Sequence, residues 1–472
     1  MNRNYKYLLL IFFSGAMVLQ SCRKNYFELN ENPSLVANPS ISSLLSTATH
    51  KTGMNNYNVT NIISNYVQYT ANPSVSAASD IYQEIDNTGT WDALYFAIAD
   101  ISDMKALAIE QGSSEYLGVA NVLISYHLTL VTDLWGNAPF SEAFQETNFT
   151  PKYDSQEDLY KASMTLLDSA IAQLARTDSK VKLAAAKDLI HAGARAKWLQ
   201  TAYALKARLL IKVSKTASYN PASVLTVLAN AYKSNADDAG MGAYFTRNPW
   251  AQVAINNAGN TLSGWLSEQF IDHLNGKTFG IFDPRLRKIS RPTVNGVYIG
   301  TVNGAGNRPP GNNTVKDENY IDSSSTWTGT SSPILIMTYT EQKFIEAEAA
   351  LTTDPARAYT AYLAGINANM DKLQVPATDP ERIAYLASAS VGAGSLTKAL
   401  IFKEKYVATY LNPEAWNDAR RFDYQYKDFT LPVNAVLPTF IRRLSYPVGE
   451  RSKNGKNIPV VGPQSERLWW DK

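Results

Sequence analysis

The stretch DSQEDLYKASMTLLDSAIAQL, residues 154–174, carries the clearest structural signal in this chain of 472 residues. Its large apolar residues recur at intervals of four and three positions, at Tyr160, Met164, Leu167, Ile171 and Leu174. This spacing aligns them in one stripe along a helix, so the stretch predicts an amphipathic helix that packs on a core through the stripe. Asp154, followed by Glu157 three positions later, predicts the N-cap.

Helical periodicity extends over most of the chain. It predicts further helices at 40–67, 93–111, 115–134, 197–215, 221–233, 262–275, 338–352, 355–372 and 396–411. Residues 240–332 are rich in Gly, Asn, Pro, Ser and Thr, with only 262–275 helical, and 413–472 is loop-rich. Helix pairs of roughly 35–45 residues, as predicted here, are typical of a helical repeat array. Long irregular segments tend to carry function. The predicted fold is mainly α, with irregular insertions and a few short strands.

The N-terminus has the pattern of an export signal. Arg3 and Lys6 precede twelve nearly uniform apolar residues, 8–19, which are too few to span a bilayer. The sequence LQSC, residues 19–22, then matches the lipobox of bacterial lipoproteins, and Cys22 is the only cysteine. We therefore predict a cleaved signal peptide at 1–21, acylation of Cys22, for example by palmitate, a tether at 22–36 and one domain at 37–472. The alternative is a signal peptide cut nearby by an ordinary peptidase.

The charges of the mature chain are balanced. Without residues 1–21 the chain has 42 basic and 42 acidic residues, so its formal net charge is zero. This balance gives no reason to expect nucleic acid as a partner. The chain also has 27 Tyr and 9 Trp, side chains that are favoured at binding surfaces.

Searches for catalytic and metal motifs find none. The four histidines, at 50, 127, 191 and 273, are isolated, and there is no HExxH, GxSxG or P-loop sequence. Residues 303–307, NGAGN, read as a turn. Glu341 and Glu348 lie on one face of a predicted helix. Either this face is solvated or ion-paired, or the two carboxylates form the catalytic pair of a glycosidase. The acidic residues Asp317, Glu318 and Asp322 lack the ligand spacing of a regular calcium site. We predict a binding protein with no cofactor and no metal, and not an enzyme.

Several motifs, in order along the chain, resemble the SusD/RagB family of outer-membrane nutrient-binding lipoproteins, and its second SusD-like subgroup in particular. The most specific is TDLWGNAPFSEA at 132–143. The others are FELNENP at 27–33, DPRL at 283–286, YTEQKFIEAEAA at 339–350, EAW and RR at 414–421, and RRLSYP with Glu450 at 442–450.

The resemblance implies one domain of about four TPR-like helix pairs with a loop-rich ligand-binding insertion at about 240–332. It implies a protein anchored in the outer membrane by lipid and facing outward, although Arg23 and Lys24 replace the acidic residues that often favour that export. The implied role is to capture oligosaccharides, or in some members peptides, and to deliver them to a SusC-like TonB-dependent transporter. A surface glycosidase is the third alternative.

The ligand site is expected in irregular segments, because rigid helices present loops there. The segments 68–91 and 298–327 supply aromatic, amide and guanidinium groups that suit a sugar. The predicted ligand-binding residues are Tyr69, Asn72, Tyr82, Tyr298, Arg308, Asn312, Tyr320 and Trp327. Trp91, which has helical spacing to Tyr95, and the motif residues Trp135, Arg420 and Arg421 are assigned to the scaffold.

Overall fold

The computed structural model describes residues 39–145, 147–258, 264–308 and 317–472. The chain divides into two units, Met1–Ser40 and Ile41–Lys472, and all that follows concerns the second. The predicted signal peptide, the acylated Cys22 and the tether lie outside the described residues and stay predictions.

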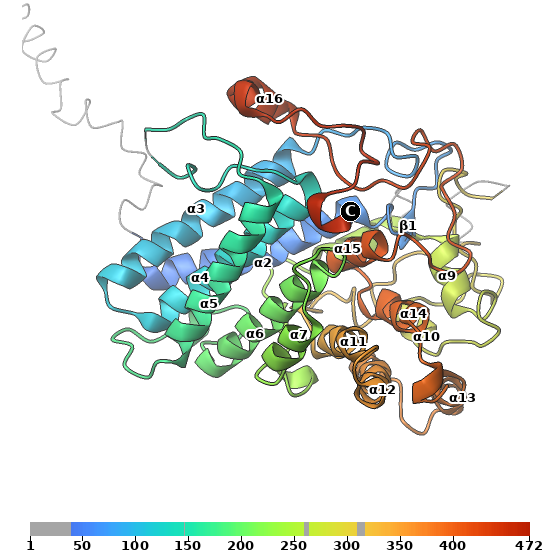
Figure 1. Cartoon of the computed structure of the whole chain (residues 1–472). Coiled ribbons are helices and arrows are strands. Elements are labelled where there is room, and N and C mark those ends of the chain that lie inside the picture. The colour runs from blue at the N-terminus through green and yellow to red at the C-terminus, as the bar shows by residue number, and fades with distance from the viewer. Residues whose placement is uncertain (1–38, 146, 259–263, 309–316) are drawn as a thin grey trace, which may run out of the picture. The chain divides into compact units, whose positions relative to one another are not determined.

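Consecutive helix pairs form the scaffold, which confirms the mainly α, TPR-like fold. Each helix packs on the next one along the chain, and the last pair packs against α7 and α6 (Figure 1). The pairs are α2 (Ile41–Ile63) with α3 (Thr88–Glu110), α4 (Ser114–Trp135) with α5 (Gln156–Ala175), α6 (Arg195–Lys212) with α7 (Pro221–Leu228), and α11 (Tyr339–Ala350) with α12 (Pro355–Lys372).

Helix α5 buries the predicted stripe but begins one residue later than predicted. Tyr160, Leu167 and Leu174 are buried. The cap is Ser155, whose hydroxyl accepts from the Asp158 N–H, so the prediction of Asp154 as N-cap is wrong. The Asp154 carboxylate instead accepts from the backbone N–H groups of Phe140 and Ser141, both at 2.8 Å. A carboxylate placed before a helix can serve either partner, and here the preceding loop provides two donors.

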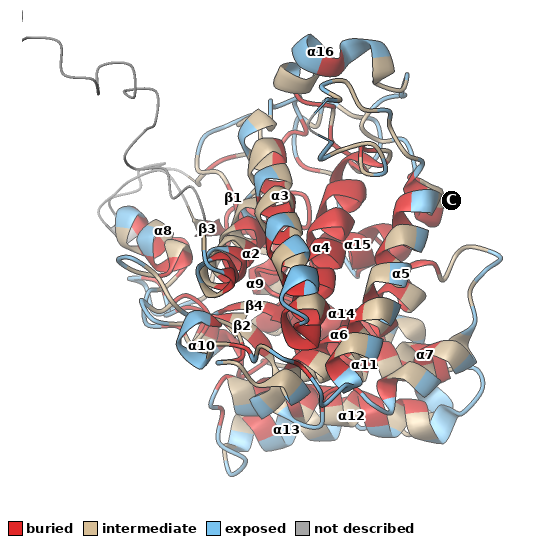
Figure 2. Ribbon diagram, turned by 90° about the vertical axis from the view of Figure 1, so that its left-hand side faces the viewer, coloured by how far each residue is buried: buried red, intermediate tan, exposed pale blue. Residues whose placement is uncertain are grey.

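Helix α4 is the central helix of the scaffold. All but one of its 22 residues are buried, and it packs on α2, α3, α5 and α6 (Figure 2). Of the helices in the described residues, this is the one long and apolar enough to cross a membrane. Its burial within the domain accounts for this composition, because a helix enclosed by other helices is apolar on every side.

Seven further α-helices lie in the described residues, and several of them were not predicted. They are α8 (Pro249–Ala258), α9 (Glu268–Leu274), α10 (Leu286–Ile289), α13 (Pro380–Ala389), α14 (Lys398–Ala408), α15 (Glu414–Arg421) and α16 (Val448–Asn454). Helix α15 is polar in sequence yet wholly buried, because its charged side chains are paired inside the domain. The predicted helix 262–275 is also shorter, since Trp265–Leu266 forms strand β3.

Two small antiparallel sheets hold the loops to the scaffold. Strand β1 (Thr70–Ala71) pairs with β3, and β2 (Ala239–Met241) pairs with β4 (Ile334–Met337). Single bridges then join Trp265 to Tyr320 and Ser267 to Thr301. The segments near 70, 301 and 320, far apart in sequence, are thereby held around β3.

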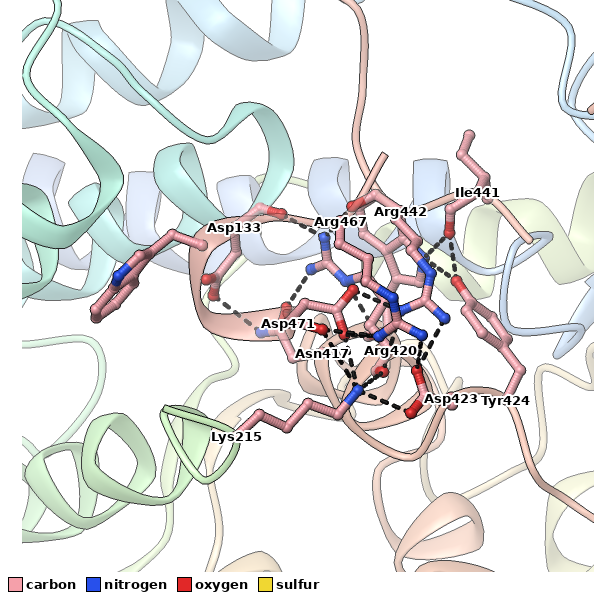
Figure 3. Close-up of polar contacts among 12 residues, drawn as sticks. Asp133, Lys215, Asn417, Arg420, Asp423, Tyr424, Ile441, Arg442, Arg467 and Asp471 are labelled. Carbon is pink, nitrogen blue, oxygen red and sulfur yellow. Dashed lines mark hydrogen bonds and ion pairs between the residues drawn. The ribbon is translucent and has the colours of Figure 1, made fainter. Parts of the chain in front are cut away.

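The arginine motif near the C-terminal end is structural (Figure 3). Arg420 is fully buried and donates to the carbonyl oxygens of Asp133, at 2.8 Å, and Arg442, at 2.7 Å. Arg442 in turn forms an ion pair with the buried Asp471 at 2.5 Å. These contacts join α4, α15 and the last residues into one polar network. Because buried charges need partners, this network restrains the relative placement of all three segments.

The other scaffold assignments are also confirmed. Trp135 is fully buried, and its indole N–H donates to the Ser445 carbonyl at 3.1 Å. Trp91 is buried against it, with ring centroids 5.0 Å apart. Arg421 is buried and forms an ion pair with Glu348.

Candidate ligand-binding site

A cavity of about 340 Å³ opens between the segments 290–294 and 318–323. We name it the Tyr320 cavity. Its lining is Ala254, Ser290, Arg291, Pro292, Thr293, Val294, Glu318, Asn319, Tyr320, Asp322 and Ser323. Its size falls within the range of small-ligand sites, and most of its lining residues are of polar type.

The side chain of Asn319 fixes the inner wall of this cavity. It is 2% exposed, and its amide nitrogen donates to the Arg291 carbonyl at 2.6 Å and to the Ser290 hydroxyl at 3.1 Å. Its amide oxygen accepts from the Ile299 N–H at 2.7 Å. A fully hydrogen-bonded buried amide holds both segments at a defined separation, so the cavity is pre-formed.

Each acidic group at the Tyr320 cavity is paired with an arginine. Asp322 forms an ion pair with Arg291 at 2.8 Å, and the buried Glu318 forms one with Arg308 at 2.8 Å. Arg308 also reaches Glu268 at 2.6 Å. The charges on the cavity wall are therefore compensated within the protein, and the wall offers hydrogen-bonding groups without a net excess of either sign.

One hydroxyl on the cavity wall lacks a partner. Thr293 is 9% exposed, and its Oγ1 is buried without a hydrogen bond to any residue that the structure describes. Buried polar groups are nearly always hydrogen-bonded, since leaving one unpaired costs about 1–3 kcal/mol. A hydroxyl left in this way at a cavity wall suits a polar ligand.

A second cavity, of about 520 Å³, lies on the other side of Ser323 and is rich in hydroxyl groups. We name it the serine cavity. It is lined by Ser323, Ser324, Ser325, Thr326, Trp327, Gly329, Thr330, Ser331, Ser332, Pro333, Leu335, Lys372 and Gln374. Trp327 is 7% exposed, and its ring packs against Tyr410 with centroids 6.1 Å apart.

A third cavity, of about 270 Å³, lies beside α9 and has a different character. Three acidic side chains, Glu268, Asp272 and Asp428, line it together with Lys277. Lys277 forms ion pairs with Asp272, at 2.6 Å, and Glu268, at 3.7 Å. None of its lining residues is aromatic, so it lacks the flat apolar surface on which a sugar ring stacks.

The predicted ligand residues fall into different environments. Tyr320 lines the Tyr320 cavity, Trp327 lines the serine cavity, and Arg308 supports the former through Glu318. Tyr69 and Tyr82 are fully buried. The Tyr69 hydroxyl donates to the Tyr406 carbonyl at 2.5 Å, and Tyr82 packs on the ring of Tyr66. Neither buried ring exposes a face to solvent, so we no longer propose Tyr69 and Tyr82 as ligand contacts.

The remaining three residues lie away from both cavities or outside the described residues. The Asn72 N–H donates to the Asp80 carboxylate at 2.9 Å, and its side chain accepts from the Ser74 N–H. Tyr298 packs on Phe282, and partial burial raises its pKa. Asn312 lies outside the described residues. Sequence reasoning missed Arg291, Thr293 and the serine cavity, although the hydroxyl-rich run at 323–332 was visible as loop composition.

The acidic residues considered for chemistry are engaged in ion pairs. Glu341 forms an ion pair with Arg208 at 2.6 Å, and Glu348 forms one with Arg421 at 2.7 Å, and none of the four side chains is more than 6% exposed. They thus form the ion-paired helix face that was one of the two predictions. In the part of the chain that the structure describes, no three His, Cys, Asp or Glu residues are grouped to hold a metal ion.

The family described as SusD-like, starch-binding and associating with the outer membrane matches residues 32–447. The chain belongs to this family. Members of the SusD-like family are binding proteins, so this protein binds its ligand and does not catalyse a reaction on it. A search among curated proteins gives no match.

Solved structures of SusD-like proteins share the fold over nearly their whole length. A SusD/RagB family protein from Bacteroides thetaiotaomicron is 21% identical, with a TM-score of 0.73, covering 92% of this chain and 99% of that one. A chitin-binding SusD homologue from Flavobacterium johnsoniae is 20% identical, with a TM-score of 0.72, covering 91% and 98%. Another structure, of a chitin-binding protein, is 22% identical, with a TM-score of 0.76, covering 92% and 100%. At this identity the likeness is one of fold.

Proposed function

We propose that this SusD-like protein captures nutrient oligosaccharides in the Tyr320 cavity and delivers them to a SusC-like TonB-dependent transporter. The observation that carries the proposal is a pre-formed polar cavity with an aromatic side chain in its wall. The printed descriptions of the family as starch-binding, and of two structural relatives as chitin-binding, support a carbohydrate.

The cavity chemistry matches that of a sugar. A sugar ring has a C–H face that packs on an aromatic ring, and hydroxyls that both donate and accept hydrogen bonds. Tyr320 supplies a partly exposed ring, Arg291 and Asp322 supply a donor and an acceptor, and Thr293 supplies a hydroxyl. In the peptide alternative the role is the same, and the cavity would bind backbone amides instead.

Calorimetry with the purified protein tests the proposal. Maltoheptaose, N-acetylchitohexaose and a mixture of tri- to hexapeptides are titrated separately. We expect an oligosaccharide to bind and Tyr320→Ala to weaken it about 5- to 10-fold, or about 1–1.4 kcal/mol, through loss of the stacking face. Tyr203→Ala, on helix α6, is the matched control and should have no effect. Binding of peptides alone would favour the alternative.

We further propose that Cys22 carries the lipid that anchors the protein in the outer membrane, facing the cell exterior. The motif at 19–22 and the absence of any second cysteine support this. A Cys22→Ser variant should lose incorporation of a labelled palmitate analogue and leave the membrane fraction. Detergent extraction of the unaltered protein should recover a TonB-dependent barrel with it. Recovery of Cys22→Ser in membranes with label retained would refute the anchor.

A further inference from the structure

The Tyr320 cavity and the serine cavity adjoin at Ser323, which lines both. A tight turn holds this residue in place. The Asp322 carboxylate accepts from the backbone N–H of Ser324 at 2.8 Å and from its hydroxyl at 2.9 Å. The Asp322 carbonyl accepts from the Ser325 N–H at 3.1 Å. Ser323 itself is exposed. The boundary between the cavities is therefore a fixed, narrow and polar wall.

Unpartnered polar groups lie on both sides of this wall. On one side is the buried Oγ1 of Thr293. On the other side, the Oγ1 of Thr326 is buried without a hydrogen bond within the described residues. These two groups are hydroxyls, which hydroxyl-bearing ligands satisfy.

The charges at the serine cavity are compensated, as they are at the Tyr320 cavity. The one charged residue in its lining, Lys372, forms an ion pair with Asp238, whose side chain is 7% exposed. A ligand with its own charge would lose hydration in either cavity and find no unpaired counter-charge among the described lining residues, which is unfavourable. An uncharged ligand meets no such penalty.

We infer that both cavities are filled by one uncharged, hydroxyl-rich oligomer that crosses Ser323, with the serine cavity as a second subsite. The inference rests on the proposed function and names its ligand class as a neutral oligosaccharide rather than an acidic one. A chain held in one cavity enters the other as an intramolecular event, so affinity rises with ligand length until both cavities are occupied.

A length series tests the two-cavity arrangement. Maltose to maltohexaose and chitobiose to chitohexaose are titrated into the unaltered protein and into Ser331→Tyr. Ser331 is exposed, its side chain makes no hydrogen bond in the described residues, and a tyrosine there fills the serine cavity. We expect the unaltered protein to bind a hexamer at least about tenfold more tightly than a dimer. Ser331→Tyr should remove this gain and leave the dimer within twofold.

Control variants and an acidic probe complete the test. Thr330→Tyr fills the same cavity from the adjacent position and should reproduce the result, whereas Thr360→Tyr, exposed on α12, should change nothing. Oligogalacturonates of matching length should not bind. The inference would be overturned if affinity did not depend on ligand length, if both filling variants kept the increase of affinity with length, or if the acidic oligomers bound more tightly than the neutral ones. Binding of the neutral oligosaccharides would still uphold the proposed function in these cases. Failure of every neutral oligosaccharide to bind would overturn both.

Discussion

Replacing Lys212 by methionine should destabilise the protein by about 3–5 kcal/mol, because it leaves two buried carboxylates without their shared cation. The Lys212 ammonium lies 2.6 Å from Asp133 and 2.7 Å from Glu414, and its side chain is 2% exposed. Burial alone acts to raise the pKa of Glu414, but Lys212 and then Arg208 more than offset this and lower it to about 2 from 4.5. A shift of this size corresponds to about 3 kcal/mol, in line with the expected loss.

Urea unfolding followed by tryptophan fluorescence, at pH 7 and at pH 4.5, measures this loss and its pH dependence. In the unaltered protein the contribution of ionised Glu414 is complete above about pH 4.5 and is lost between there and about pH 2. In Lys212→Met, burial favours the protonated form of the Glu414 carboxyl. Lowering the pH therefore reduces the difference in unfolding free energy between the variant and the unaltered protein. Lys206→Met, on the same helix α6 as Lys212, removes a surface ion pair with Asp168 of α5 and should cost less than about 1 kcal/mol. The reasoning would be refuted if Lys212→Met lost less than about 1 kcal/mol of unfolding free energy at pH 7, or if this loss became larger at pH 4.5.

Two further substitutions test close packing and buried charge elsewhere. Gly304→Ala should lower stability by about 2–4 kcal/mol in the same unfolding assay, because a Cβ there would lie 1.9 Å from the Val433 carbonyl oxygen, at φ +81°. Gly296→Ala, at φ +73° with open space around it, isolates the backbone cost and should lose about 1 kcal/mol. Arg285→Met removes the guanidinium 2.6 Å from the fully buried Glu404 and should lower the thermal midpoint by an amount equivalent to about 3–5 kcal/mol. An effect of Gly304→Ala equal to that of Gly296→Ala would contradict the close-packing argument.

The sequence predicted the long helices well because their apolar stripes are also their buried faces. Helix α12 runs over the predicted range 355–372, and α4 and α11 differ from prediction by no more than two residues at either end. Helix α15 was missed because its eight residues have no apolar stripe. It is helical because α6, α11 and α14 provide ion-pair partners for its charged side chains, and the partners on α6 and α11 lie far away in sequence.

The site was predicted only in part because the sequence does not state which loop side chains point outward. Tyr69 and Tyr320 both stand in irregular segments with equal aromatic character. Strand β1 aligns Tyr69 with the core, where it meets Tyr406, whereas Tyr320 follows Asn319 along the wall of a cavity. Side chains alternate between the two faces of a strand, but a strand of two residues or a single bridge is too short for this alternation to be recognised in the sequence. Hydroxyl-rich loops have still less pattern, so Thr293 and the lining of the serine cavity emerge only from the three-dimensional placement.

The residues that identify the family and those that would bind ligand belong to different parts of the molecule. Trp135, Arg285 and Arg420 are buried and fully engaged with the scaffold. The cavity lining combines exposed and half-buried side chains with buried ones, such as Asn319, that fix its segments in place. A substitution at Ser331 therefore leaves the scaffold network intact, whereas one at Arg420 breaks it. A change in the exposed part of the lining can therefore alter ligand preference with little change in stability. This separation is why a resemblance carried by buried motifs predicts the fold closely, and why the glycan must be inferred from the chemistry of the loops.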